Sequence, residues 1–179
     1  MNDWNVVITI AAGPHQEASR FLATLGQVSR SDFFNVLTMK VEDIPAFLER
    51  MRQLLANDPR AAVLIGRAIP ASQVFAFHGP EEFLAQAREL VAGLAPRVAG
   101  QSFHVRLRRR GFKGRISSMQ VEQDLDEALL QATTTLGQPA QVSFSDPQVI
   151  VALETVGNRA GLSLWERKQR LKYPFLRLD

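Results

Sequence analysis

The sequence predicts an α+β fold built from two successive α/β units. Short apolar runs rich in Val and Ile alternate with stretches of helical periodicity along the 179-residue chain, a pattern typical of a protein that combines strands with helices. Apolar residues make up 46% of the chain and charged residues 22%, which is an ordinary globular composition. We therefore expect the chain to form a buried hydrophobic core. The sequence contains no low-complexity linker.

The first unit, residues 1–66, is expected to contain three strands and two helices. An apolar run ends at Gly13-Pro14, and Asp43 has the character of a helix N-cap. The predicted elements are a strand over residues 4–11, a helix around 18–25, a strand over 33–41, a helix over 44–57 and a strand over 62–69. This order within about 70 residues predicts a ferredoxin-like unit.

The second unit, residues 67–179, is expected to contain further helices and strands and a basic C-terminal tail. Pro80, followed by two glutamates, marks a helix start. Ser117 and Gln120 have the spacing of a capping box and predict the start of a later helix. The remaining predicted strands are residues 141–144 and 149–153, which we expect to be neighbours joined by a turn.

A third strand of this unit is predicted over Ser102–Arg108, because apolar and polar side chains alternate strictly there. One face carries Phe103, Val105 and Leu107, which we expect in the core. The opposite face carries His104, Arg106 and Arg108. We expect this second face to be exposed and basic.

Basic residues concentrate in the second half of the chain. Residues 101–179 hold twelve Lys and Arg against eight Asp and Glu, whereas residues 1–100 hold nine against ten. Six cations follow one another without an intervening acidic residue: Arg106, Arg108, Arg109, Arg110, Lys113 and Arg115. Such a local density suits an anionic partner.

The chemistry of this segment fits RNA. Guanidinium groups hold phosphate oxygens through paired hydrogen bonds and also stack on bases, and glycines let the backbone approach a phosphate. Phe112 is a candidate platform for a stacked base. The alternative interpretation is a solvated basic turn with Phe112 packed into the core, and composition favours the two equally. The candidate RNA-binding residues are His104, Arg106, Arg108, Arg109, Arg110, Gly111, Phe112, Lys113, Gly114 and Arg115.

Catalytic and metal-binding motifs are absent from the sequence. The chain has no cysteine, which excludes disulfides, iron–sulfur clusters and cysteine nucleophiles. The three histidines form no HExxH pattern, and the glycines form no GxGxxG or Walker loop. We therefore expect no catalytic residue, no cofactor and no metal. We interpret the four acidic residues of one helix as its solvated side: Glu122, Asp124, Asp126 and Glu127.

The sequence also bears on localisation. The start of the chain has no basic n-region, and no apolar stretch reaches the roughly 20 residues of a membrane helix. We therefore expect a soluble cytoplasmic protein that does not bind membranes.

Four stretches in order resemble a THUMP domain over about residues 67–160. They are RAIPASQVFAF, QSFHVRLRRRGFKG, SSMQVEQDLDEALL and QVSFSDPQVIVALET. The arginine-rich strand end, the Asp-Pro turn and Lys172-Tyr173-Pro174 further resemble the small THUMP proteins that assist tRNA cytidine acetylation. The resemblance implies a ferredoxin-like companion domain before the THUMP domain, and tRNA binding, in several relatives at the unpaired CCA end.

The resemblance also implies a role in tRNA modification. In larger relatives a separate module performs the chemistry, and we expect no room for one here, since the chain ends about 20 residues after the match. The expected function is a non-catalytic adaptor that binds tRNA and presents it to a modifying enzyme, such as a cytidine acetyltransferase. The alternative is a protein–protein interaction module whose basic patch binds an acidic partner. The oligomeric state is left open. Trp165, Tyr173 and Phe175 of the tail are expected either to face the enzyme or to close the core.

Overall fold

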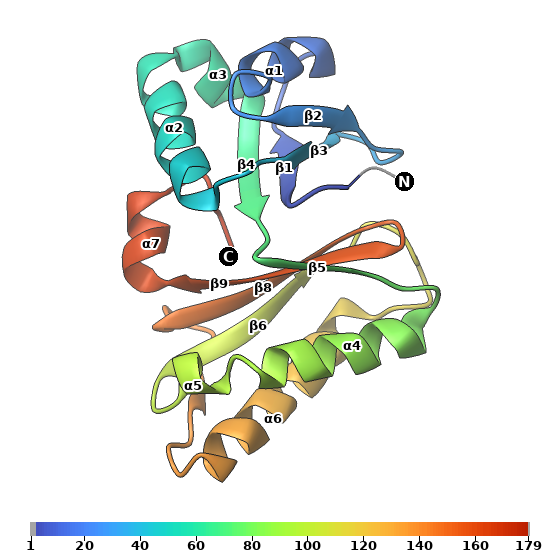
Figure 1. The fold of residues 1–179 in the computed structure, drawn as a ribbon, viewed down its shortest axis with the longest axis vertical. Coiled ribbons are helices and arrows are strands. Elements are labelled where there is room, and N and C mark those ends of the chain that lie inside the picture. The colour runs from blue at the N-terminus through green and yellow to red at the C-terminus, as the bar shows by residue number, and fades with distance from the viewer. Residues whose placement is uncertain (1–2, 179) are drawn as a thin grey trace. The chain divides into compact units, whose positions relative to one another are not determined.

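The computed structural model describes residues 3–178 and contains two β-sheets with associated helices (Figure 1). The predicted α+β class is confirmed. The chain divides into two compact units, one formed by residues up to 74 with residues 172–177, the other by residues 75–171. The expected boundary after residue 66 falls within a strand of the first unit, β4 (Ile65–Pro70).

The first unit has the strand and helix order of a ferredoxin-like fold. Its elements before β4 are β1 (Val6–Ile10), α1 (His15–Leu22), β2 (Gln27–Arg30), β3 (Val36–Lys40), α2 (Ile44–Asn57) and α3 (Pro59–Leu64). The four strands form one sheet in the order β2-β3-β1-β4, in which every neighbouring pair is antiparallel. The helices bury apolar side chains, among them Leu22, Phe47, Met51 and Leu64. The βαββαβ order is that of ferredoxin-like proteins.

Two elements of this unit differ from the sequence expectation. Strand β2 was not expected, because Val28 is the single large apolar side chain of Gln27–Arg30. Its pairing with β3 is what defines these residues as a strand. Residues 62–64 belong to helix α3 rather than to a strand. Asp58 explains the second difference, because its carboxylate accepts hydrogen bonds from the backbone N–H groups of Arg60 and Ala61. The Asp58-Pro59 pair therefore starts a new helix as well as ending α2.

The second unit is a five-stranded mixed sheet with helices. Its elements are β5 (Gln73–Ala76), α4 (Pro80–Ala92), α5 (Ala95–Val98), β6 (Ser102–Arg108), α6 (Ser118–Thr135), β7 (Gln141–Val142), β8 (Val149–Val156), β9 (Arg159–Glu166) and α7 (Arg167–Lys172). The sheet order is β5-β9-β8-β6-β7. Strand β6 runs parallel to both of its neighbours, whereas β8 and β9 are antiparallel.

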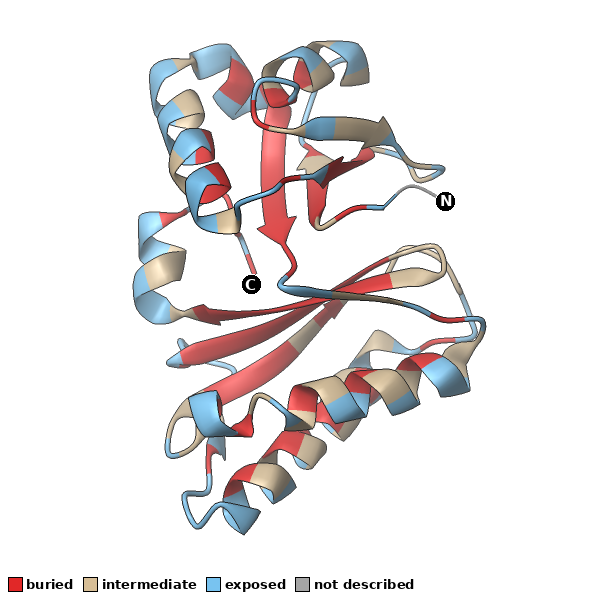
Figure 2. Ribbon diagram, viewed as in Figure 1, coloured by how far each residue is buried: buried red, intermediate tan, exposed pale blue. Residues whose placement is uncertain are grey.

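Helices α4 and α6 cover one face of this sheet (Figure 1). The predicted apolar face of β6 points toward them, because Phe103, Val105 and Leu107 belong to the same buried cluster as Phe83 of α4 and Leu125 of α6. Figure 2 shows the buried residues as stripes along both helices and as nearly continuous runs in β8 and β9. The expected capping residue of α6 is confirmed, since the Ser117 hydroxyl accepts from the Gln120 N–H.

The end of the chain differs most from the expectation. Strands β7 and β8 are not neighbours, because each pairs with a different edge of β6. Strand β9, which was not expected, contains Trp165, and this side chain is buried. Tyr173 and Phe175 are buried in the first unit, where the Phe175 carbonyl accepts from the Ala68 N–H at 3.0 Å. All three tail aromatics are therefore core residues. No helix within residues 3–178 is both long and apolar enough to cross a bilayer.

Candidate nucleic-acid interface

The predicted basic segment, residues 106–115, begins in β6 and continues into the loop after it. The end of β6 is fixed by its parallel register with β8, in which Arg106 lies opposite Ala152 and Arg108 opposite Glu154. Lys113, Gly114 and Arg115 are exposed, whereas the four arginines before them are partly buried. The structure thus brings the predicted cations together on one strand end and one loop.

Arg110 anchors this loop to β8. Its guanidinium forms an ion pair with the carboxylate of Glu154, which is only 2% exposed. Its backbone N–H donates to the Thr155 hydroxyl at 2.9 Å, and its carbonyl accepts from the Gly157 N–H, also at 2.9 Å. Arg110 is therefore a structural residue of the loop, and sequence analysis did not separate it from its neighbours.

Gly111 lets the loop approach the turn between β8 and β9. Its φ of +103° lies in the region that favours glycine. A Cβ atom there would lie 3.2 Å from the Gly157 Cα. The two glycines therefore pack backbone against backbone. The short turn Gly157-Asn158, set between two strand-like runs, is the sequence signal that predicts this hairpin.

Phe112 packs into the second unit. Its ring lies 5.2 Å from the ring of Phe77, between centroids, and contacts the buried cluster. The Arg115 guanidinium lies over the same ring, 5.2 Å from its centroid, which is a cation–π arrangement. The ring is thus engaged with protein groups, as in the alternative interpretation of the sequence, and it helps to place the exposed Arg115.

His104 lies on the same strand face as Arg106 and Arg108, as the alternation predicted, but its side chain is buried, with 3% exposure. Its Nδ1 lies 3.0 Å from the Ser143 carbonyl oxygen. A carbonyl only accepts, so Nδ1 carries the proton and donates it. Burial lowers the pKa of His104 below its ordinary value, which favours the neutral ring. We expected this face of β6 to be exposed, and this expectation is wrong for His104.

Acidic side chains of α6 bind the open edge of β6. Strand β7 pairs only with Ser102 and Phe103. Beyond them, the Asp126 carboxylate accepts from the Val105 N–H and the Glu122 carboxylate accepts from the Leu107 N–H, both at 2.7 Å. Burial raises the pKa of Asp126 to about 6. The interpretation of these carboxylates as a solvated helix side was wrong for Asp126, which is 5% exposed.

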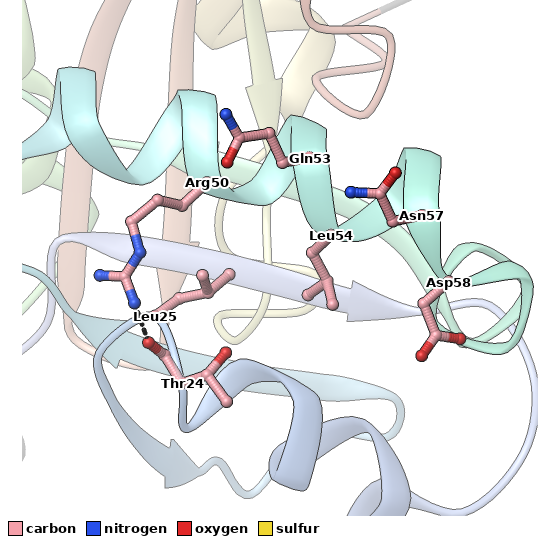
Figure 3. Close-up of a pocket in the computed structure, with 7 residues that line it drawn as sticks. All are labelled: Thr24, Leu25, Arg50, Gln53, Leu54, Asn57 and Asp58. Carbon is pink, nitrogen blue, oxygen red and sulfur yellow. Dashed lines mark hydrogen bonds between the residues drawn. The ribbon is translucent and has the colours of Figure 1, made fainter.

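The first unit contains an open pocket of about 430 Å³ between α2 and the loop after α1 (Figure 3). Its Arg50 guanidinium donates to the Thr24 carbonyl oxygen, and Asp58 at one end caps α3. Both polar groups therefore have structural partners, and we assign no function to this pocket. Among residues 3–178, no group of three or more His, Cys, Asp or Glu is placed to hold a metal ion.

A family comparison identifies the second unit. Residues 80–164 match the family model of the THUMP domain. This part of the chain is a THUMP domain. The match includes the whole basic segment, α6 and nearly all of β9, so the candidate interface lies inside the THUMP domain. Among curated proteins, none matches the chain.

Several solved structures share the fold. PH1313 from Pyrococcus horikoshii is 13% identical with a TM-score of 0.58, and the match covers 92% of this chain and 55% of that one. TrmN from Thermus thermophilus is 21% identical with a TM-score of 0.63, covering 90% and 44%. A 4-thiouridine synthetase, solved with RNA and ATP, is 11% identical with a TM-score of 0.54, covering 92% and 42%. This chain thus spans about half or less of the length of these proteins.

Proposed function

We propose that this protein binds RNA, with tRNA as its preferred class, through the basic segment of its THUMP domain. The observation that carries the proposal is the placement of six cations on one strand end and loop inside a domain of an RNA-binding family. The solved structure of a 4-thiouridine synthetase bound to RNA, which shares the fold, supports the same function.

The structure divides the candidate residues by role. Lys113 and Arg115 are exposed in the loop and Arg109 is partly buried there, and we assign the phosphate contacts to these three residues. Arg106 and Arg108 extend the positive surface along β6. Gly114, which has positive φ and open space around it, lets the loop backbone approach the RNA, while Gly111 packs against Gly157 and shapes the loop. Arg110 and Phe112 position these groups through Glu154 and Arg115, whereas the buried His104 bonds to the Ser143 carbonyl.

We further propose that the protein is a non-catalytic adaptor that presents tRNA to a separate modifying enzyme, of which a cytidine acetyltransferase is one candidate. The support for this role is the resemblance of the arginine-rich strand end, the Asp-Pro turn and Lys172-Tyr173-Pro174 to the small THUMP proteins that assist tRNA cytidine acetylation. An adaptor raises the effective concentration of RNA near the enzyme and lowers the apparent Michaelis constant.

A competition experiment tests the proposed function. The purified protein is titrated with labelled tRNA, and unlabelled tRNA or poly-glutamate is added as competitor. We expect tRNA to compete and poly-glutamate, at equal charge concentration, to compete poorly. Equal competition by poly-glutamate would instead indicate a protein module that recognises acidic partners. Modification of tRNA by the purified protein with acetyl-CoA, S-adenosylmethionine or ATP alone would contradict the adaptor role.

A further inference from the structure

Helices α4 and α6 of the THUMP domain border a pocket of about 420 Å³ near the start of each helix. Four of the residues that line it are apolar: Pro80, Leu84, Ile116 and Val121. Its volume is within the range of pockets that bind small ligands. Protein interfaces commonly use such pockets to hold one large anchoring side chain.

The two helices that border this pocket are acidic. Together they contain seven acidic residues and a single basic one, Arg88. Four of the acidic side chains belong to exposed residues: Glu81, Glu82, Glu89 and Glu127. This charge is opposite to that of the basic segment. The helical side of the domain therefore repels RNA phosphates and favours a positively charged partner.

Asp124 contributes an acceptor to the wall of the pocket. Its Oδ1 binds the Arg88 guanidinium at 2.9 Å. Its Oδ2 is buried and has no hydrogen-bond partner among residues 3–178. A buried acceptor without a donor is unfavourable, and an ammonium or guanidinium that reached this oxygen would remove the cost. The Arg88 side chain is 50% exposed, so a change of its rotamer gives such a group access to the carboxylate.

The other end of the pocket borders the basic loop. Arg115 lines the pocket there, and its guanidinium lies over the ring of Phe112. Asp124 lies two turns of α6 beyond the capping residue Ser117, or roughly 10 Å along the helix. A basic occupant is therefore repelled at one end of the pocket and attracted at the other, which selects one orientation. An occupant in this position lies beside the loop to which we assign the phosphate contacts.

We propose that this pocket docks a basic segment of a partner protein, in which a large apolar side chain lies next to a lysine or arginine. The apolar side chain fills the space between Leu84 and Val121, and the cation binds the Asp124 carboxylate. The inference rests on the proposed adaptor role and deepens it, because it gives the partner enzyme a surface separate from the cations that bind RNA.

The first test selects peptides from a random library displayed on phage, with RNA-free wild-type protein as the bait. We expect the enriched peptides to share a large apolar residue next to a lysine or arginine. Enrichment of acidic peptides, or of peptides without a common pattern, would overturn the proposal. One enriched peptide is then labelled and titrated with purified variants, and fluorescence anisotropy measures its affinity.

Leu84→Ala tests the apolar wall of the pocket. This variant should bind the peptide at least about fivefold more weakly than wild type. Leu90→Ala is the matched control, because Leu90 is also a partly buried leucine of α4 that packs against the same cluster but does not line the pocket. The control should bind the peptide like wild type. Equal losses in the two variants would place the peptide elsewhere.

Asp124→Asn tests the binding of the cation, because it keeps an oxygen for Arg88 and removes the charge. It should weaken peptide binding about tenfold. Glu127→Gln removes the same charge from the same helix outside the pocket and should have little effect. Replacing the basic residue of the peptide by glutamine should weaken binding to wild type and leave binding to Asp124→Asn unchanged. Equal losses in both proteins would overturn the role of Asp124.

Titration of the same proteins with tRNA separates this inference from the proposed function. We expect Leu84→Ala and Asp124→Asn to bind tRNA like wild type. If wild-type protein binds tRNA but selects no basic, apolar peptide, the docking pocket is wrong while RNA binding stands. If the peptide binds in this pocket and wild-type protein does not bind tRNA, the proposed RNA binding fails while the pocket stands.

Discussion

Arg110 forms an ion pair with Glu154, a carboxylate that the sheet almost completely buries. The pair joins the loop after β6 to β8 within the THUMP domain. Burial raises the pKa of the Glu154 carboxyl, and the Arg110 guanidinium opposes this rise. The geometry of the basic segment therefore depends on Arg110, one of its own cations. A variant that removes Arg110 would change the shape of the segment as well as its charge.

The first prediction concerns the stability of this pair. Arg110→Ala leaves the buried Glu154 carboxylate without its main partner and should lower the free energy of unfolding by about 3–5 kcal/mol. Arg109→Ala, at a neighbouring cation that donates to the Gly111 carbonyl, should cost less than about 1 kcal/mol. Urea unfolding followed by circular dichroism measures both. Equal unfolding midpoints for the two variants would show that the ion pair does not hold the loop.

The second prediction compares two loop glycines that both have positive φ, +103° for Gly111 and +75° for Gly114. A Cβ at Gly111 meets the Gly157 backbone at 3.2 Å, whereas a Cβ at Gly114 meets nothing within 4 Å. Gly114→Ala should cost about 1–2 kcal/mol from backbone strain alone, and Gly111→Ala should cost more, because the hairpin turn must also move. Thermal unfolding of the two variants checks the order, and a larger loss for Gly114→Ala would contradict the packing described here.

The third prediction concerns pH. Because the pKa of Asp126 is raised to about 6, above roughly 4 in an unfolded chain, the folded protein holds this proton to higher pH. Its contribution to stability therefore falls as pH rises from about 4 to about 6. Asp126→Asn keeps an acceptor for the Val105 N–H without a charge. The free energy of unfolding of this variant should exceed that of wild type by about 1–3 kcal/mol at pH 7, and this advantage should shrink as pH falls from about 6 to about 4.

Glu127→Gln is the control for this measurement, since Glu127 lies next in the same helix but is exposed. Its effect on the free energy of unfolding should be small and nearly independent of pH. A stability difference between Asp126→Asn and wild type that stays constant from pH 4 to pH 7 would contradict the raised pKa.

The sequence predicted those elements whose structure depends on residues close to one another in the chain. Strand β6 has the predicted bounds, Ser102–Arg108, because alternation over seven residues leaves one consistent strand assignment. The caps of α2 and α6 at Asp43 and Ser117 are likewise confirmed. A capping side chain bonds to a backbone N–H group no more than three residues away, so the interaction can be predicted from the local sequence.

Features that depend on distant pairing were missed. Glu154 looks like an ordinary strand residue, and its importance arises only from the parallel register that sets it opposite Arg108. His104 bonds to Ser143 in the connection between β7 and β8, two strands that lie on opposite sides of β6. Neither relationship has a short-range pattern in the sequence.

The salt dependence of tRNA affinity tests the central claim that the basic loop of the THUMP domain binds RNA phosphates. The informative variant is Arg109→Ala/Lys113→Ala/Arg115→Ala, which leaves the Arg110–Glu154 pair intact. Arg20→Ala/Arg30→Ala/Lys168→Ala removes the same charge from exposed positions outside the loop. Each phosphate contact contributes roughly 0.7–0.9 to the slope of log affinity against log salt.

We therefore predict that the loop variant reduces the magnitude of this slope by about 2–3, with weaker tRNA binding, while the control variant stays close to wild type. A loop variant that keeps the wild-type slope and affinity would contradict the account.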